Sequence, residues 1–307
     1  MISKVEIKNE NILIKENFKH INTLDSEYTD LILKICDAVE SKVLEFVTYS
    51  KKGSVCLTSK DFSGLKKPIK IQVGYLFWDG TEILLPIYVD KKEHIIFDSK
   101  VKKNIIQKVK QDYITDGYED TDGTWIEPKD EKNMPIYIHY GDNCIMNEIS
   151  ILPTQESENV KLDAFKNVLN KKLSSKDLYS WIRYEEDYEN SERIYNDFQY
   201  RNNSLLLVKY AMLYGLGKGS SIRIKRNPLS LIVNENDVYM DIEKFSCKEK
   251  EMMSLFGDIA RRIILTQPKI RSLAEGRGLV MIEHSKDKVI IKDMLTRYFP
   301  SLDFIFV

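Results

Sequence analysis

The stretch FSCKEKEMMSLFGDIARRIILTQ, residues 245 to 267, decides the fold. Ser246 is suited to cap a helix, and Glu249 three residues later completes a capping-box pattern. Apolar side chains then recur at three- and four-residue spacing, which predicts a helix with one apolar stripe and two arginines at or near its edge. The stripe comprises Met252, Leu255, Phe256, Ile259, Ile263 and Ile264, and the arginines are Arg261 and Arg262.

Strand patterns surround this helix on both sides. IRIKR (222–226), LSLIV (229–233) and DVYMDI (237–242) precede it, whereas the apolar run LVMIE (279–283), a further helix and DFIFV (303–307) follow. Continuous apolar strands that alternate with helices are typical of a parallel sheet that is buried on both faces. The sequence therefore predicts an α/β fold in which LVMIE is a central strand beside DFIFV.

The first part of the chain has a different pattern. Residues 1 to 24 alternate between apolar and charged side chains, which predicts short antiparallel strands. A helix is expected next, with Asp25 or Ser26 as its cap and an apolar face from Leu31 to Phe46 that packs on a sheet.

The middle of the chain alternates between strands, a loop and helices. Residues 68 to 97 predict strands with a hairpin at Asp79–Gly80. The polar segment from 116 to 133 is expected to be an exposed, mobile loop. PIYIHY (135–140) predicts a buried strand, and about 160 to 214 predict helices.

Composition narrows the class of protein. The chain has 307 residues, of which 43% are hydrophobic and 30% charged, and its net charge is −1. This balance is ordinary for a globular protein and gives no indication of nucleic-acid or membrane binding. Because no stretch approaches roughly 20 apolar residues, no membrane span or targeting segment is expected. The widely spaced cysteines predict free, mostly buried thiols in the cytoplasm and no zinc site. They are Cys36, Cys56, Cys144 and Cys247.

Several motifs occur in an order that resembles one known family. FSCKEKE (245–251), GDIARR (257–262), GLVMIE (278–283) and FPSLDFIFV (299–307) are similar to the C-terminal half of ABC/SMC-type AAA-family ATPase heads from anti-phage systems such as Septu and certain retrons. In that family the same order is a signature loop, a long helix, a Walker B strand and a helix that leads into the last strand.

Upstream segments extend the resemblance to about residues 134 to 307. SWIRYEEDYEN (180–190), PIYIHYG (135–141) and the strand block before Ser246 match family motifs, and SKVEIKN (3–9) matches the usual first strand. The resemblance implies an ABC-ATPase-like head with an N-terminal antiparallel β region, a helical insertion and a C-terminal parallel-sheet core.

The resemblance also implies three parts of the head. Residues 1–158 are expected to form its β-rich part with a degenerate phosphate-loop region. Residues 159–214 are expected to form the helical insertion. Residues 215–307 are expected to form the ATPase-like core, with a degenerate signature and a degenerate Walker B strand.

The phosphate-loop region departs from the family pattern. A phosphate loop requires glycines so that backbone N–H groups wrap the phosphates. The first glycine of this chain is Gly53, and LDSEYTDLILK (24–34) stands where the family has its glycine-rich loop. The acidic residues Asp25, Glu27 and Asp30 occupy that region. Four lost N–H bonds would cost about 6 kcal/mol, at ~1.5 kcal/mol each.

The other nucleotide motifs are altered as well. Lys248 stands where the signature glycine belongs, although Ser246 and Glu249 remain. Glu283 and His284 follow the Walker B strand in place of its aspartate and the catalytic glutamate. The segment from residue 278 to 300 is too short for the family's D-loop, and the sequence ends where the switch histidine is expected. These departures predict no ATP or other cofactor, no catalytic residue and no enzymatic activity, that is, a pseudo-ATPase.

Three further features have bland interpretations. The glycine-rich run 215–221 follows a helix and precedes a strand, which is the reverse of the phosphate-loop order, so a turn is expected. Residues 185–189 contain a cluster of carboxylates within a predicted helix. Consecutive carboxylates on a helix point in different directions, so the cluster is expected to be a solvated face and not a metal site. The histidines share no spacing and are expected to be structural or exposed. The cluster is Glu185, Glu186, Asp187 and Glu189, and the histidines are His20, His94, His139 and His284.

These observations favour a binding, regulatory or structural subunit. The partner would be a copy of this chain, or an active ATPase or nuclease in an anti-phage complex, with Ser246, Lys248 and Glu249 at or beside the contact. A phage-encoded counter-defence mimic of such a head would have the same sequence features. The alternative is an unorthodox NTPase or nucleic-acid-processing enzyme of the same fold. Nucleic-acid contact has little support, because the basic residues are interspersed with acidic ones.

Overall fold

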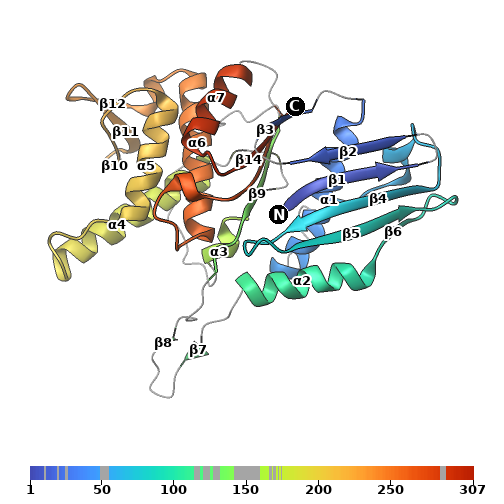
Figure 1. The fold of residues 1–307 in the computed structure, drawn as a ribbon. Coiled ribbons are helices and arrows are strands. Elements are labelled where there is room, and N and C mark those ends of the chain that lie inside the picture. Colours follow the sequence, from blue (N-terminus) through green and yellow to red (C-terminus); the bar gives the residue numbers. More distant parts are fainter. Residues whose placement is uncertain are drawn as a thin grey trace.

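The computed structural model shows a mixed α/β protein (Figure 1). An antiparallel sheet lies at one end, a parallel sheet lies in the middle, and most of the helices lie at the other end. The structure describes residues 1–9, 12–18, 21–24, 27–48, 55–113, 118–119, 125–126, 132–141, 160–165, 168, 171, 173, 175–283 and 288–307.

The antiparallel sheet contains five strands in the order β2-β1-β4-β5-β6. Alternation decides which side chains are buried: Val5 and Ile7 face the core, whereas Lys8 is exposed. The β4–β5 hairpin turns at Asp79–Gly80, where Gly80 has a φ of 84°, as the sequence predicted. The strands are β1 (Ile2–Lys8), β2 (Leu13–Asn17), β4 (Ile69–Leu76), β5 (Glu82–Val89) and β6 (Ile95–Phe97).

The second sheet has four strands, all parallel, in the order β3-β14-β13-β9. Val280 pairs with Phe304 on one side and with Ile138 on the other. All residues of β13 and of β9 are buried, which confirms a central strand with β14 beside it. The strands are β3 (Ile21–Thr23), β9 (Ile136–Tyr140), β13 (Gly278–Ile282) and β14 (Asp303–Phe306).

Helix α1 (Thr29–Thr48) connects the two sheets. Its two buried carboxylates reach different sheets: the Tyr75 hydroxyl donates to Glu40 at 3.2 Å, and the Tyr137 hydroxyl donates to Asp37 at 2.8 Å. The apolar face predicted for this helix is buried from Leu31 to Val43. The predicted caps Asp25 and Ser26, and the Phe46 side chain, lie outside the described residues.

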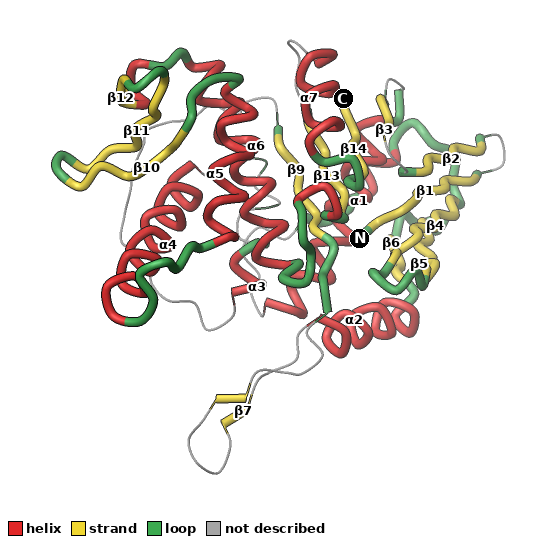
Figure 2. Tube along the Cα trace, turned by 60° about the vertical axis from the view of Figure 1, so that its left-hand side comes forward, coloured by secondary structure: helices red, strands yellow, loops and turns green. Residues whose placement is uncertain are grey.

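The helices that follow β9 in the sequence cover the parallel sheet and form the end that is opposite the antiparallel sheet (Figure 2). Helices α5 and α6 approach closely where Gly215 and Gly257 lie, because a Cβ at Gly215 would come within 2.6 Å of the Met252 carbonyl oxygen. The helices are α3 (Val160–Asp163), α4 (Ser175–Tyr195), α5 (Asn203–Leu216), α6 (Cys247–Thr266) and α7 (Lys288–Tyr298).

The remaining helix, strands and turns complete the fold. The glycine-rich run between α5 and β10 is a turn, as predicted, with Gly217 as a left-handed cap at φ 74°. The predicted mobile loop 116–133 lies mostly outside the described residues, which include two short paired strands. The elements are α2 (Ser99–Tyr113), β7 (Tyr118–Glu119), β8 (Trp125–Ile126), β10 (Ser221–Arg226), β11 (Leu229–Glu235) and β12 (Val238–Asp241), with short 3-10 helices at Ser59–Phe62, Ile242–Lys244 and Leu273–Glu275.

The two arginines of α6, which were expected at or near the edge of its apolar stripe, are not exposed to solvent. Both are buried, and each bonds Asp258: Arg262 Nε at 2.8 Å and Arg261 Nη2 at 3.0 Å. The Tyr140 hydroxyl donates to the same carboxylate at 2.8 Å. Charge-assisted hydrogen bonds with a partner three and four residues away make burial of both guanidinium groups possible.

The acidic cluster on α4 is also not a simple solvated face. Glu186 accepts from Lys209 Nζ at 2.8 Å and from the Ile224 backbone N–H at 3.1 Å. Glu185 accepts from the side-chain amide of Asn202 at 2.6 Å. These carboxylates attach α4 to α5 and β10, since each lies at the contact between elements. In the described part of the chain, no cluster of side chains has the composition of a metal site.

Cysteine burial also differs from the expectation. Cys36 is buried, whereas Cys56 and Cys247 are exposed, and all three are free thiols. Cys144 lies outside the described residues.

Candidate functional site

Charged side chains meet at the carboxyl edge of the parallel sheet. His139 is the fourth residue of β9, and Glu283 directly follows β13, so the two neighbouring strands place them side by side. Asp37 reaches the same place from α1. In parallel α/β sheets this edge is where ligands bind, so it is the candidate site.

Each ring nitrogen of His139 makes a hydrogen bond with a carboxylate. Nδ1 lies 2.9 Å from both Asp37 oxygens, and Nε2 lies 2.8 Å from Glu283 Oε1. Lys171 Nζ lies 2.5 Å from the same Glu283 oxygen. Because a carboxylate only accepts hydrogen bonds, both imidazole nitrogens can donate only when the ring is protonated. We name these four residues the His139 network.

The charges within the network stabilise one another. Burial opposes protonation of His139, but the hydrogen bonds to Asp37 and Glu283 outweigh it and raise the pKa of His139. The hydrogen bond from His139, followed by that from Lys171, lowers the pKa of Glu283 to about 2 although its partial burial opposes this. The network therefore favours the pair of an imidazolium and a carboxylate over the neutral forms of both groups.

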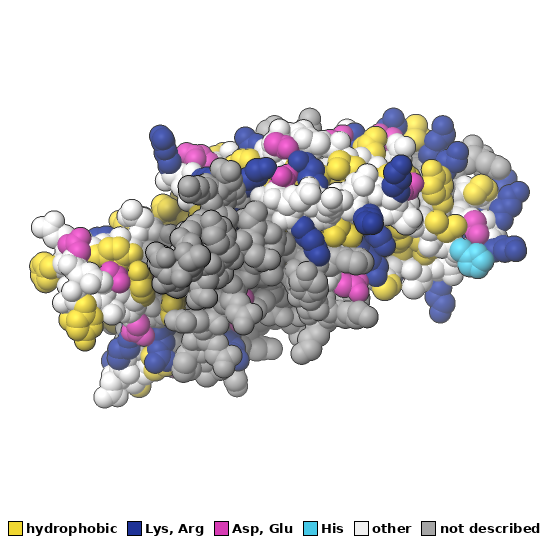
Figure 3. All heavy atoms as spheres, turned by 90° about the horizontal axis from the view of Figure 1, so that it is seen from below, with side chains coloured by type: hydrophobic (Ala, Val, Ile, Leu, Met, Phe, Trp, Pro, Cys, Tyr) yellow, Lys and Arg dark blue, Asp and Glu magenta, His cyan; other side chains and the backbone are white. Residues whose placement is uncertain are grey.

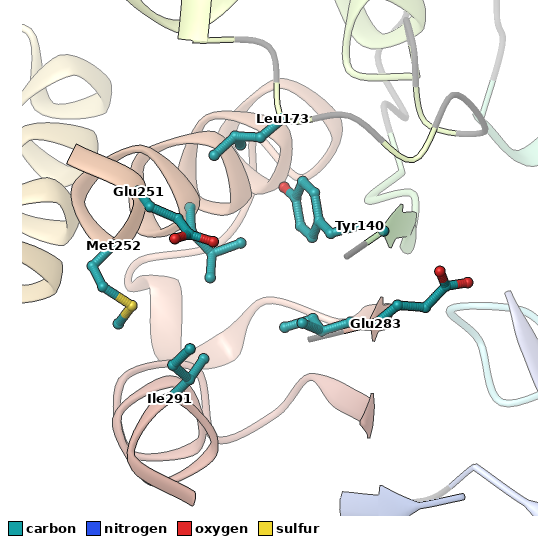
Figure 4. A pocket seen from close by; sticks show the side chains of 9 residues that line it. Tyr140, Leu173, Glu251, Met252, Glu283 and Ile291 are labelled. Atoms are coloured by element: carbon teal, nitrogen blue, oxygen red, sulfur yellow. The ribbon is translucent and has the colours of Figure 1, made fainter. Parts of the chain in front are cut away.

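A small pocket adjoins Glu283 between the sheet edge and α6 (Figure 4). The Glu251 carboxylate points into it, whereas the Glu283 carboxylate points away from it and bonds His139. Its cavity volume is about 10 Å³, close to the minimum for one water molecule. A triphosphate does not fit the pocket as folded here. The lining residues are Tyr140, Gly141, Leu173, Glu251, Met252, Leu255, Ile282, Glu283 and Ile291.

The predicted interface residues lie at the start of α6 and do not line this pocket. Ser246 Oγ accepts from the Glu249 backbone N–H at 3.3 Å, and Glu249 accepts from the Ser246 N–H at 2.8 Å, which confirms the capping box. Lys218 pairs with Glu249 at 2.7 Å and, as the largest cause, lowers the pKa of Glu249 to about 2. Lys248 is exposed, but Glu249 is only partly so because it is occupied by these contacts.

The sequence did not predict the His139 network. The residues at 37, 139, 171 and 283 are too far apart to form a motif, and only the position of His139 in an apolar strand indicated a buried ring. Of the acidic residues in the phosphate-loop region, Glu27 and Asp30 are exposed at the start of α1. His20, Asp25 and His284 lie outside the described residues.

Two curated proteins match part of the chain. The Retron Ec83 probable ATPase of Escherichia coli is 33% identical over 103 residues, which are 32% of this chain and 19% of that protein. The Retron Vc95 probable ATPase of Vibrio cholerae serotype O1 biovar El Tor is 32% identical over 91 residues, 27% of this chain and 18% of that protein. This chain is related to retron ATPases. The matched stretch spans about a fifth of the length of these relatives.

The relation to retron ATPases confirms the resemblance and corrects one expectation. The prediction that the chain is not an enzyme is at odds with relatives that are named probable ATPases. The altered motifs gave no evidence about hydrolysis itself. A missing glycine lowers the affinity for phosphate, but it does not determine whether the protein hydrolyses ATP.

The remaining comparisons add little detail. Solved structures of the recombination mediator protein RecF, RecF-ATPrS and RecF-ATP in the RecFOR pathway, align with TM-scores of 0.38 and 0.36 at 11% and 12% identity. Both alignments cover 100% of this chain, and they cover 92% and 91% of the RecF chains. No protein-family model matches the chain. No helix within the described residues is long and apolar enough to span a membrane.

Proposed function

We propose that this chain is the ATPase-like head of an anti-phage defence assembly and that it acts through contact with a protein partner. The observation that carries this proposal is the relation to two retron ATPases. The contact face is the start of α6, where a preserved capping box presents Lys248 to solvent. The partner is a copy of this chain or another protein of the same defence system.

The experiment is a charge reversal at this face. Lys248→Glu is expected to reduce protection in a plaque assay of cells that express the chain with its genomic neighbours. Lys70→Glu is the matched control, because Lys70 is an exposed lysine on β4 of the antiparallel sheet. Both variants should retain the native melting temperature within a few degrees, since exposed substitutions change stability by roughly ±0.5 kcal/mol.

The outcome also distinguishes defence from counter-defence. Protection by Lys248→Glu equal to that of the native chain, at equal protein level, would show that this face is not the contact. More plaques on expression of the native chain would show that it opposes defence and would overturn the proposal.

Nucleotide hydrolysis is a second candidate function. It is favoured by the names of the relatives and by the position of Glu283 at the end of β13, where a carboxylate could activate water. Hydrolysis of ATP would require the pocket beside Glu251 to open and Glu283 to turn toward it from His139 and Lys171. If this chain hydrolyses ATP, Glu283→Gln should lower phosphate release by about a hundredfold or more in the assembled complex. An equal rate in the variant would exclude Glu283 as the base.

A further inference from the structure

Lys171 lies at the edge of the candidate site, in the segment that leads into α4. Its φ is 56°, a left-handed backbone conformation that residues other than glycine rarely adopt. Such strain persists only where surrounding contacts hold it, and it is common at ligand clamps and switches. The contacts of Lys171 therefore indicate what the strained backbone is for.

Two contacts fix Lys171. Its carbonyl oxygen accepts from the Gly141 N–H at 2.8 Å, and its ammonium lies 2.5 Å from Glu283 Oε1. Gly141 permits this approach, because a Cβ there would lie 3.0 Å from the Lys171 Cβ. The Glu283 N–H in turn donates to the Tyr140 carbonyl at 2.8 Å. Both backbones are thus attached to the end of β9, so the two side chains can separate by rotation alone.

The two cationic partners of Glu283 differ in exposure. The His139 side chain is 0% exposed, whereas the Lys171 side chain is 42% exposed. Both bond the same oxygen, Oε1. A ligand that reaches this edge of the sheet can therefore contact the Lys171 ammonium but not the imidazole. When the ammonium leaves, the carboxylate still has the hydrogen bond from His139.

The charges around the pocket indicate which ligand would take the ammonium. The described residues that line the pocket include two carboxylates, Glu251 and Glu283, and no lysine, arginine or histidine. A phosphate at the pocket would need a cation from beside it. Lys171 is in that position, because its contact Gly141 and the nearby Leu173 both line the pocket. Lysine binds phosphate as a point charge on a flexible stem.

Lysines on the open surface are placed differently. Seen from below, lysine and arginine side chains are spread over the described part of the molecule, among acidic and apolar ones (Figure 3). Charges that are surrounded by water and salt interact weakly with a ligand. Lys171 differs from them because its backbone is held in a strained conformation at the sheet edge where ligands bind.

We propose that Lys171 is the phosphate-binding cation of this site and that it exchanges Glu283 for a phosphate oxygen of a nucleotide. As folded here, the ammonium bonds Glu283. In the bound state it bonds phosphate, and Glu283 is left with one hydrogen bond fewer, so less is lost when its carboxylate turns toward the pocket. This inference rests on the second candidate function, nucleotide hydrolysis, but its tests measure binding.

The first test measures the affinity of the full chain for ATP with Mg²⁺ by calorimetry. Lys171→Met retains an unbranched apolar side chain without the charge, and it should weaken binding about tenfold or more. Inorganic triphosphate should show the same loss, because the ammonium contacts phosphate and not the base. Lys176→Met is the matched control, because Lys176 is exposed at the start of α4. It should bind like the native chain.

The second test combines Lys171→Met with Glu283→Gln. Because Glu283 competes for the ammonium, Glu283→Gln alone should bind ATP about twofold to fivefold more tightly than the native chain. Lys171→Met should then weaken binding by a larger factor in the Glu283→Gln chain than in the native chain. If Lys171 contributed only to the general charge of the site, the two factors would be equal.

The outcomes separate the exchange from hydrolysis. Weaker ATP binding by Lys171→Met with unequal factors, but no phosphate release in the assembled complex, would support the exchange and exclude hydrolysis. Phosphate release with equal ATP affinities in the native chain and Lys171→Met would retain hydrolysis and overturn the exchange. Equal factors in the two backgrounds would also overturn it. If neither the native chain nor Glu283→Gln binds ATP at millimolar concentration, both ideas fail.

Discussion

At the scale of single residues, the protein buries charges in pairs. Asp258 is fully buried and bonds Arg261, Arg262 and Tyr140, so that residues of α6 and β9 depend on one carboxylate. Arg262 also donates to the Ala164 carbonyl, which connects α6 to the segment after α3. Loss of one partner from a buried pair leaves the other charge uncompensated. The free-energy cost of that buried charge exceeds the stability that the intact pair contributes.

Asp258→Ala should therefore destabilise the fold by about 3–5 kcal/mol. Asp293→Ala serves as control, since Asp293 pairs with Arg297 on the exposed side of α7 and such pairs contribute roughly 1 kcal/mol or less. Chemical denaturation of both variants provides the measurement. Similar losses in the two variants would mean that the Asp258 pairs are not compensating buried charge.

The His139 network predicts a dependence of stability on pH. Because the pKa of His139 is raised above its ordinary 6.5, protonated His139 contributes stability that is complete below pH 6.5 and is lost as pH rises through the folded-state pKa. The charged groups that face the ring are Asp37, Glu283 and Lys171. In the native chain this contribution should leave the melting temperature unchanged from pH 5 to 6.5 and lower it as pH rises from 6.5 to 9.

His139→Gln should flatten that fall in the melting temperature. His94→Gln is the control, because His94 is exposed in the β5–β6 turn, and it should retain the native profile. An unchanged slope in His139→Gln would show that other groups cause the pH dependence.

At the scale of elements, the contact between α5 and α6 depends on glycine. A Cβ at Gly215 would meet the Met252 carbonyl oxygen at 2.6 Å and the Phe256 ring at 2.8 Å. Gly215→Ala should separate the helices and destabilise the fold by roughly 1–3 kcal/mol, more than the gain in helix propensity of about 1 kcal/mol. Gly64→Ala meets nothing within 4 Å and should leave the melting temperature nearly unchanged. Equal melting temperatures in the two variants would contradict this packing.

Elements defined by local patterns could be predicted from the sequence. The capping box at Ser246, the strand LVMIE and the hairpin at Asp79–Gly80 depend on residues within a few positions of one another, and the structure confirms all three. The His139 network and the burial of Arg262 depend on partners from distant segments. A single sequence does not indicate such partners, so these features required the fold.

At the scale of the whole molecule, α1 shares its buried faces with both sheets, and one continuous apolar core includes residues from every layer. Unfolding should therefore be a single transition. Trp78 at the β4–β5 turn and Trp181 in α4 report on opposite ends of the molecule. Variants that retain only Trp78 or only Trp181, with Trp125 replaced in both, should give coincident fluorescence midpoints in urea. Separate midpoints would show two independently unfolding parts.

The order of strands in the parallel sheet has a consequence for synthesis. Strand β14 lies between β3 and β13, so Phe304 pairs with Ile21 across almost the entire sequence. During synthesis, strand β3 therefore remains without its partner strand until residue 306 has left the ribosome. Contacts between distant segments form slowly, and strands that wait for a partner are prone to aggregate. Growing chains of this protein should therefore depend on chaperones until strand β14 has been synthesised and can pair with β3.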